Sequence, residues 1–222
     1  MNYQAFVKYI SNVNNFPLPG KRAHILMAPN LVRKLYLPNE GNDKYETLLE
    51  NYPNATKAAV LLYFYENEGQ LNLTLIKRTT YDGPHSGQIS FPGGKPESVD
   101  SSLWETAKRE FEEELGVTIS LNESFLTLSP VYIPPSNFLV TPFVFVAKMR
   151  PFFQIDSREV ALQLDISLNE LIHLKIKQRP LLEDIHKGVI VPCYTYKEHM
   201  IWGATAMILS EFICFLKERT LI

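Results

Sequence analysis

The sequence is poor in the features that would point to secretion or to nucleic acid. It has only two cysteines, Cys193 and Cys214, which cannot form a disulfide framework, so we expect a reducing, cytoplasmic environment. Its 22 Lys and Arg residues are balanced by 24 Asp and Glu residues, giving a net charge of −2. A chain without a basic excess lacks the electrostatic footprint of a nucleic-acid-binding protein, and we predict no such partner.

Features of membrane insertion and export are lacking as well. No apolar run is long enough to cross a bilayer, and residues 1–20 lack the basic start and apolar run of a signal peptide. The sequence also lacks internal repeats and low-complexity tracts. What is present is a chain of 222 residues, 45% hydrophobic and 12% aromatic, which is enough for one well-packed domain without a membrane partner.

The most informative stretch runs from Gly93 to Val117 and predicts one capped helix. Ser102 and Glu105 have the spacing of a capping box, in which each side chain bonds the backbone amide of the other residue. Gly116 stands where a left-handed C-terminal cap favours glycine. Between these caps, four apolar residues share one side of the helix, which we expect to be buried: Trp104, Ala107, Phe111 and Leu115.

Three carboxylates, Glu110, Glu113 and Glu114, lie on an adjacent side of this helix. Like charges at this spacing repel by roughly a few tenths of a kcal/mol per pair. One interpretation of the glutamate run is a solvated helix face. The other is a site for a hard divalent cation, Mg²⁺ or Mn²⁺, which prefers carboxylate oxygens and shares its shell with substrate phosphates. The Phe-Pro-Gly-Gly turn before the helix, and Arg109 beside the first glutamate, favour the cation site.

The segment before the helix predicts a β-hairpin and a loop. Residues 58–65 form an apolar strand pattern, 66–70 a turn, and 71–78 a returning strand that ends at Lys77 and Arg78. Residues 79–90 are rich in glycine and small polar residues. A loop of this kind, between a basic strand end and an acidic helix, is suited to binding phosphate through backbone amides, and the alternative is an ordinary surface connection.

Other patterns predict the remaining elements. Pro142 suggests that its strand lies at an edge or begins near this residue. We interpret His24 as a surface or packed residue rather than a ligand. Helical spacing predicts helices over residues 3–10, 42–52, 168–174 and 203–217, and apolar runs predict strands over 125–133, 140–148 and 189–196.

The helix and its preceding turn resemble the Nudix hydrolase signature: Gly, five residues, Glu, seven residues, then Arg-Glu-apolar-x-Glu-Glu-x-Gly-apolar. The second half matches without a gap at Arg109, Glu110, Phe111, Glu113, Glu114, Gly116 and Val117. The first half carries one extra residue, because Gly93-Gly94 and Asp100 stand where the signature has its glycine and glutamate. We therefore expect Asp100 to pair with Arg109, with Glu105 as the alternative partner.

The resemblance implies an α/β/α sandwich with a mixed β-sheet over residues 58–222, and an N-terminal helical extension, residues 1–57, packed on this core. It also implies a metal-dependent hydrolase that cleaves the pyrophosphate bond of a nucleoside diphosphate linked to another group. The metal ligands implied for Mg²⁺ or Mn²⁺ are Glu110, Glu113, Glu114 and the Gly93 carbonyl. The candidate catalytic residues are Glu110, Glu113 and Glu159, because either a metal-bridging glutamate or Glu159 supplies the general base. The alternative for Glu159 is a charged loop residue.

Residues before the helix resemble a second motif, found in coenzyme A pyrophosphatases, that runs Leu-Leu-x-x-Arg, a second arginine, then Gly-x-x-x-Phe-Pro-Gly-Gly. The residues that match it are Leu75, Arg78, Gly87, Phe91, Pro92, Gly93 and Gly94. The second arginine falls on Gly83, so His85 or Lys77 would have to replace it. The resemblance implies coenzyme A or an acyl derivative as the small-molecule substrate, cleaved to 3′,5′-ADP and a phosphopantetheine. The residues expected to bind it are Arg78, Lys77, His85, Ser86, Gly87, Gln88, Phe91 and Lys95.

Two other functions are compatible with the same signature. The first is a Nudix hydrolase of ADP-ribose or of a dinucleotide. The second is a nucleotide sensor without catalysis, and the intact set of Glu110, Glu113 and Glu114 argues against it. The sequence does not reveal the oligomeric state, and a homodimer is compatible with it.

Overall fold

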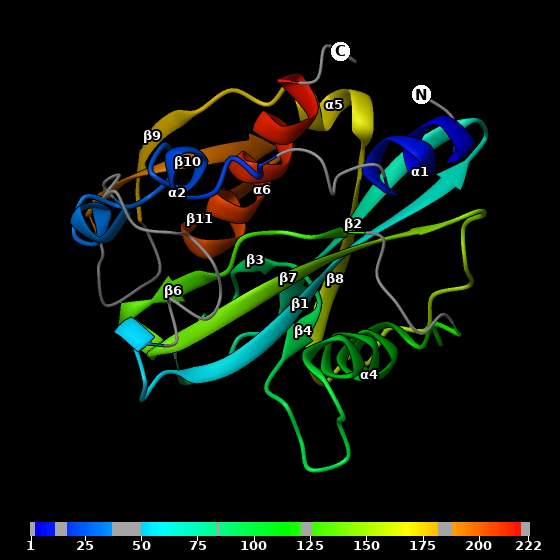
Figure 1. Cartoon of the computed structure of the whole chain (residues 1–222), viewed down its shortest axis with the longest axis horizontal. Coiled ribbons are helices and arrows are strands. Elements are labelled where there is room, and N and C mark those ends of the chain that lie inside the picture. The colour runs from blue at the N-terminus through cyan, green and yellow to red at the C-terminus, as the bar shows by residue number, and fades with distance from the viewer. Residues whose placement is uncertain are drawn as a thin grey trace.

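A mixed β-sheet forms the centre of the molecule (Figure 1). The computed structural model describes residues 3–11, 17–36, 50–83, 85–120, 126–181 and 188–218. The strands of the sheet are β1 (Thr56–Asn67), β2 (Gln70–Arg78), β3 (Ile89–Ser90), β4 (Gly93–Gly94), β5 (Leu126–Thr127), β6 (Val131–Ile133), β7 (Phe138–Ala147) and β8 (Val160–Ser167). Their order is β3-β2-β1-β7-β5, and β4, β6 and β8 pair with β1, β7 and β2 respectively.

The two longest strands run side by side in parallel. β1 and β7 pair from Thr56↔Phe138 to Tyr65↔Ala147, and the other ladders of this sheet are antiparallel in the described part of the chain. The predicted hairpin is confirmed: β1 turns into β2 through Glu68 and Gly69, both with positive φ. That geometry matches the right-handed twist of a two-residue hairpin.

Helices cover both faces of the sheet, which confirms the predicted layered α/β fold. In Figure 1, α4 (Leu103–Leu115) lies below the strands, whereas α1 (Tyr3–Ser11), α2 (Lys21–His24) and α6 (Gly203–Lys217) lie above them. The short helix α5 (Leu168–Ile172) packs into the same hydrophobic core as α1 and α6, on the face of the sheet opposite α4. Among the described residues are also the 3₁₀ helices η2 (Arg33–Tyr36) and η3 (Pro134–Ser136).

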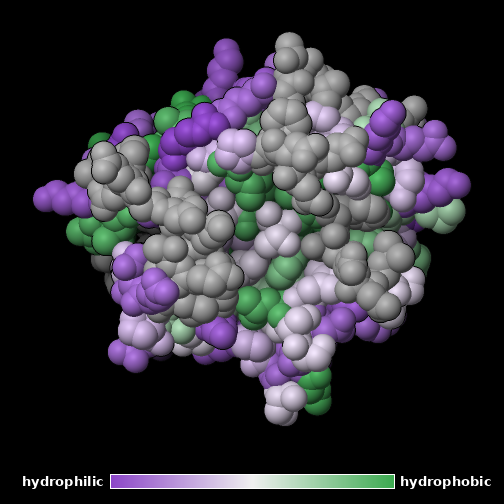
Figure 2. All heavy atoms as spheres, in the orientation of Figure 1, coloured by the Kyte–Doolittle hydropathy of each residue, from purple (hydrophilic) through white to green (hydrophobic). Residues whose placement is uncertain are grey.

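Each face of the sheet has its own hydrophobic core. The core beneath α4 includes Trp104 and Phe111, and the larger core on the opposite face includes Phe6, Phe64 and Phe212. Side chains on a strand alternate between faces, so β1 supplies both cores in turn. On the face viewed in Figure 2, hydrophilic side chains gather at the rim and paler or apolar ones lie in the middle.

Helix α4 forms as its caps predict. The Ser102 hydroxyl accepts a hydrogen bond from the Glu105 amide at 3.2 Å, and Gly116 is left-handed with φ 69°. The four apolar residues expected to be buried are all 7% exposed or less. The second half of the predicted capping box is wrong, because the Glu105 carboxylate lies 2.9 Å from Lys108 Nζ instead of reaching back.

Strand β7 corrects the prediction drawn from Pro142. The residue lies in the middle of the strand, between β1 on one side and β5 and β6 on the other. The partner of β7 changes there, since β6 pairs with its first three residues and β5 pairs with Phe143 and Val144. The missing amide of Pro142 is tolerated at this junction, where its carbonyl still accepts from Leu128 at 3.0 Å.

The far end of the chain contains a second sheet that the sequence predicts only in part. Strands β9 (Lys177–Pro180), β10 (Ile190–Tyr196) and β11 (His199–Trp202) have the order β11-β10-β9, and only β10 is predicted. The predicted strand over 125–133 is divided into β5 and β6, with residue 125 outside the described residues. The predicted helix over 42–52 lies mostly outside them.

The packed interpretation of His24 is confirmed. His24 is 1% exposed, and its Nε2 lies 3.0 Å from Oε2 of Glu211, which is fully buried. The Glu211 carboxylate also accepts from the amides of Gly20 and Ser129, so it joins the N-terminal segment to α6. Within the described ranges, both cysteines are free thiols, and none of the helices has the length and apolar character needed to cross a membrane.

Candidate active site

The three glutamates of α4 occupy different environments. The side chain of Glu114 is 1% exposed, that of Glu110 is 16% exposed and that of Glu113 is 54% exposed. Because the apolar side of α4 faces the sheet, the neighbouring Glu114 lies beneath the helix while Glu113 stays at its outer edge. A purely solvated helix face is therefore excluded for Glu110 and Glu114.

Glu114 is held from two directions. Its Oε2 accepts a hydrogen bond from the Gly93 amide at 3.0 Å, and its Oε1 lies 3.3 Å from Nη1 of Arg78 at the end of β2. Burial raises the pKa of Glu114 to about 8, although Arg78 and the Gly93 amide both favour the charged carboxylate. A second positive charge beside this carboxylate would lower that pKa and keep it ionised at neutral pH.

The glycine pair of β4 makes room for the acidic helix. Gly94 lies against Glu110, and a Cβ atom added to Gly94 would stand 2.4 Å from the Glu110 carboxylate. At Gly93 the φ angle is 146°, and an added Cβ would stand 2.2 Å from the carbonyl oxygen of Ala59 on β1. Gly93 therefore requires glycine, whereas a side chain at Gly94 would have to displace the Glu110 carboxylate.

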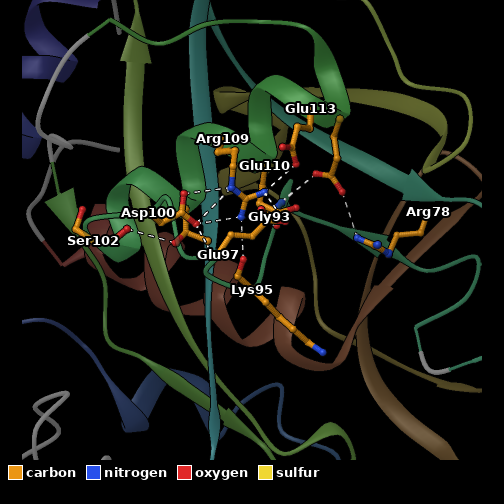
Figure 3. Close-up of polar contacts among 11 residues, drawn as sticks. Arg78, Gly93, Lys95, Glu97, Asp100, Ser102, Arg109, Glu110 and Glu113 are labelled. Carbon is orange, nitrogen blue, oxygen red and sulfur yellow. Dashed lines mark hydrogen bonds and ion pairs between the residues drawn. The ribbon is translucent and has the colours of Figure 1, made fainter.

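Arg109 connects the turn to the helix. Its Nη2 donates to Asp100 and to Glu110, both at 3.1 Å, and to the carbonyl of Lys95 at 2.9 Å, while its Nη1 donates to Glu113 at 2.8 Å (Figure 3). The hydrogen bond with Asp100 is the main reason why the pKa of Arg109 is raised. Asp100 thus takes the place of the signature glutamate, as predicted, and Arg109 holds the glutamates in position.

The charge of Asp100 is stabilised by this network. Burial works against its ionisation, but hydrogen bonds from Arg109, the Glu97 amide and Thr106 hold the pKa of Asp100 below its usual value. The alternative partner, Glu105, pairs with Lys108 instead.

A fourth carboxylate approaches from another segment. Glu159 directly precedes β8, and its charge contributes to the raised pKa of both Glu110 and Glu114. The largest cause of the raised pKa at Glu110 is burial, which Arg109 partly offsets. Glu110 and Glu114 of α4 therefore form one acidic group with Glu159, which is distant from them in the sequence.

The loop over residues 79–90 is closed by its own hydrogen bonds. The amides of Tyr81, Gly87 and Gln88 donate to Ser86 Oγ, the Thr79 carbonyl and the His85 carbonyl. The expectation that the backbone amides of this loop face a phosphate is therefore not met at these three positions. His85 Nδ1 lies 3.3 Å from the Gln88 side chain, so these two predicted binding residues contact each other.

Two of the predicted substrate-binding residues, Phe91 and Lys77, lie away from the acidic group. Phe91 is 2% exposed in the core opposite α4, so it packs the domain and is not accessible to a substrate. Lys77 is next to Arg78 on β2, so its side chain faces the opposite side of the sheet. Lys95 is exposed, and its Nζ lies 5.1 Å above the ring of Phe138.

The acidic group has the donor chemistry of a divalent cation site. Among the residues that the structure describes, no three His, Cys, Asp or Glu side chains are assembled in a metal-binding geometry, and the α4 glutamates bind Arg78 and Arg109 instead. Burial is the main cause of the raised pKa of Glu110 and Glu114, and the nearby charge of Glu159 adds to it at both residues. A hard cation with oxygen ligands fits this set.

Comparisons with known proteins agree with this site. Residues 55–182 match the NUDIX domain family. The uncharacterized Nudix hydrolase NudL of Yersinia enterocolitica is 38% identical over 142 residues, covering 63% of this chain and 71% of the relative. Nudix hydrolase 15, mitochondrial, of Arabidopsis thaliana is 31% identical over 170 residues, covering 73% and 59%. The MutT/nudix family protein from Enterococcus faecalis shares the fold, with a TM-score of 0.50 at 15% identity over 86% of this chain and 75% of that one.

The layered fold, the glycine turn and the acidic helix define a hydrolase domain of the α/β class. The chain belongs to the Nudix family. It is accordingly an enzyme, a pyrophosphohydrolase acting on nucleoside diphosphate derivatives, and enzymes of this family generally use divalent metal ions.

Sequence reasoning found the acidic helix but missed two neighbours. Gly94 borders Glu110, and the only signal for it was the glycine pair of the motif. Thr79 contacts the backbone beside Glu159, and no sequence signal marks it, because the contact joins residues that are far apart in the chain.

Proposed function

We infer that this enzyme hydrolyses the pyrophosphate bond of coenzyme A or an acyl derivative, giving 3′,5′-ADP and a 4′-phosphopantetheine. The supporting observation is the contact between Arg78 and Glu114. Arg78 belongs to the motif that resembles coenzyme A pyrophosphatases, and Glu114 belongs to the Nudix helix. The contact brings the two motifs together at one site. A substrate with several phosphates would need cationic and metal-binding groups side by side in this way.

Each residue of the site has a role in this proposal. Glu110 and Glu114 are the first ligands of a Mg²⁺ or Mn²⁺ ion, and Glu113 and the Gly93 carbonyl complete the set. A divalent cation neutralises the charge of a diphosphate and acidifies a water molecule. Glu159 is assigned as the general base, because its side chain is exposed to solvent and lies within the electrostatic field of Glu110 and Glu114.

Cationic side chains bind the anionic substrate in this proposal. Arg78 is 24% exposed beside Glu114, so its guanidinium can contact a phosphate oxygen and also keep Glu114 charged. Lys95 is exposed on the segment between β4 and α4. His85, Ser86 and Gln88 lie in the loop after Arg78, where their side chains would meet the substrate, because the amides of Gly87 and Gln88 are already bonded within the loop.

A substrate panel tests the proposal. The purified protein is mixed with Mg²⁺ or Mn²⁺ and with coenzyme A, acetyl-coenzyme A, ADP-ribose and dinucleotides, and the products are identified by mass spectrometry. We expect 3′,5′-ADP from both coenzyme A compounds. Cleavage of ADP-ribose or of dinucleotides in place of coenzyme A would overturn the substrate assignment and leave the family assignment intact.

The matched control is Glu114→Gln, which keeps the shape of the side chain and removes its charge. It should release no product from any compound of the panel, whereas Glu112→Gln, on the exposed side of the same helix, should retain activity. Product formation by Glu114→Gln at the wild-type rate would mean that a contaminating hydrolase is responsible.

A further inference from the structure

The segment that carries Glu159 is attached to the end of α4. The Gln154 amide donates to the Leu115 carbonyl at 2.8 Å, and the Asp156 amide donates to the Glu114 carbonyl at 3.0 Å. The last carbonyls of a helix have no partner within the helix, so they accept hydrogen bonds from another segment. These two bonds fix the position of the segment relative to the glutamates of α4.

A second attachment comes from Thr79, directly after β2. The Thr79 amide donates to the Glu159 carbonyl at 2.9 Å, and its hydroxyl donates to the Arg158 carbonyl at 3.0 Å. The first carbonyl belongs to the peptide unit after Glu159, and the second belongs to the peptide unit before it. Fixing both peptide planes fixes φ and ψ of Glu159, and therefore the direction in which its side chain leaves the backbone.

A β-bulge lies beside the contact between Thr79 and the backbone around Glu159. The register between β2 and β8 changes from Lys77↔Leu162 to Arg78↔Val160, so Ala161 is an extra residue on β8. The bulge brings Val160 into the core beneath α4, whereas Leu164 lies in the core on the other face. Bulges redirect side chains beside functional sites, and this one turns the start of β8 toward the acidic helix.

We propose that Thr79 is a positioning residue, whose hydroxyl fixes the direction of the Glu159 side chain relative to Glu110 and Glu114. This inference rests on the proposed function in one respect, the assignment of Glu159 to the reaction. Thr79 itself does not touch the reacting atoms. Thr79 also connects the loop of residues 79–90 to the backbone around Glu159, because the Thr79 carbonyl accepts a hydrogen bond from the Gly87 amide at 3.2 Å.

The test begins with Thr79→Val, which removes the hydroxyl and retains the branched shape and the backbone amide. We expect kcat to fall about tenfold, because the general base is no longer oriented. Mn²⁺ binding, measured by calorimetry, should stay at its wild-type value, because Thr79 does not contact the proposed metal ligands. KM should change little. Thr79→Ser should keep the wild-type kcat, because it retains the hydroxyl. Thr79→Ala should match Thr79→Val, because both substitutions remove the hydroxyl; a wild-type kcat in Thr79→Ala alone would mean that valine strains the loop and would overturn the inference.

The matched control is Thr118→Val. The Thr118 hydroxyl donates to Glu112 on the exposed end of α4 and contacts neither Glu159 nor the loop. It should leave kcat and Mn²⁺ binding as in the wild type. A wild-type kcat in both Thr79→Val and Thr79→Ala would overturn the inference.

A double-mutant cycle separates positioning from general support of the fold. In a Glu159→Gln background, Thr79→Val should have no further effect on kcat, because the residue it positions is no longer functional. An equal tenfold loss in both backgrounds, or full activity of Glu159→Gln, would show that Thr79 does not act through Glu159. Failure of the wild type to cleave coenzyme A overturns the proposed substrate alone, since the cycle can be run on whichever compound of the panel is cleaved.

Discussion

At the scale of single residues, Glu114 shows how burial changes the protonation of a carboxyl group. Folding raises the pKa of this carboxyl from its ordinary 4.5 to about 8. The native state therefore binds this proton more tightly than the unfolded state does. In metal-free protein the resulting stability is fully present below about pH 4.5 and is lost as the pH rises toward 8, with a slope of at most about 1.4 kcal/mol per pH unit.

The first prediction follows from that slope. In the presence of a chelator, Glu114→Gln should remove the decline of stability between pH 5 and pH 8, and at pH 8 it should melt at or above the wild-type temperature. Chemical denaturation at several pH values measures this. Exposed Glu112→Gln is the control and should keep the wild-type slope. A slope that survives in Glu114→Gln would place its origin at another group.

Asp100 gives a second residue-scale prediction. Asp100→Asn keeps the size of the side chain but removes the charge that Arg109 contacts, so we expect a loss of about 1–3 kcal/mol in the free energy of unfolding. Glu97 is the control, because it lies 4.0 Å from Arg109 and is 65% exposed. Glu97→Gln should change stability by less than about 0.5 kcal/mol. Equal effects of the two substitutions would contradict the special role of Asp100.

The sequence predicts the identities of these residues better than their environments. Helical spacing puts Glu110, Glu113 and Glu114 on one side of α4, but it does not say which of them faces the sheet. That depends on the position of β4 and β2, which no local pattern encodes. The predicted partnership of Asp100 with Arg109 is confirmed because both residues lie within one turn and the helix that follows it.

At the scale of elements, local sequence signals predict α4, whereas several strands depend on pairing with distant segments and are predicted less well. The caps of α4 lie within its own sequence, so its bounds follow from Ser102 and Gly116. Strands β9 and β11 are too short to be predicted from a local pattern, and each forms by pairing with β10, which lies between them. The prediction from Pro142 was wrong for a related reason: a proline within β7 is tolerated because the pairing partner changes there from β6 to β5, which no local pattern encodes.

Gly116 provides the element-scale prediction. It needs its left-handed φ, and an added Cβ would also stand 2.7 Å from Gln154 Cβ and 2.8 Å from the Gln154 carbonyl oxygen. Gly116→Ala should therefore cost about 1–3 kcal/mol beyond the backbone strain and loosen the segment that carries Glu159. The measurements are denaturant unfolding and hydrogen exchange at the Gln154 and Asp156 amides.

Gly69 is the matched control for Gly116. Its φ is +76°, and an added Cβ would meet nothing within 4 Å, so Gly69→Ala reports the backbone strain alone. If the two alanine variants lose the same stability, the contact with Gln154 carries no weight, and α4 does not hold that segment through Gly116.

At the scale of the whole molecule, the N-terminal segment and the C-terminal helix complete the core opposite α4. Phe6 of α1 and Met27 share that core with residues of α6. We propose that residues 1–57 are an extension packed on a Nudix domain of residues 58–222. The resemblance predicted this arrangement, whereas the contacts of His24 with Glu211 had no sequence signal, because 187 residues separate the pair.

Phe6 tests whether the extension belongs to the same folding unit. Its side chain is fully buried, with its ring 5.3 Å from that of Phe64 on β1 and 6.3 Å from that of Phe212 on α6. Phe6→Ala should destabilise the whole domain by about 3–5 kcal/mol and lower its melting temperature by roughly 10 °C. Exposed Gln4→Ala on the same helix is the control.

The location of Phe6 also predicts that Phe6→Ala leaves the catalytic constants unchanged. The acidic group lies on the α4 side of the sheet, and Phe6 packs on the other side. At temperatures well below the melting point, Phe6→Ala should therefore keep the wild-type KM and kcat while unfolding in one transition with the rest of the domain. A separate early transition, or a melting temperature equal to that of Gln4→Ala, would mean that the extension does not contribute to the stability of the catalytic domain.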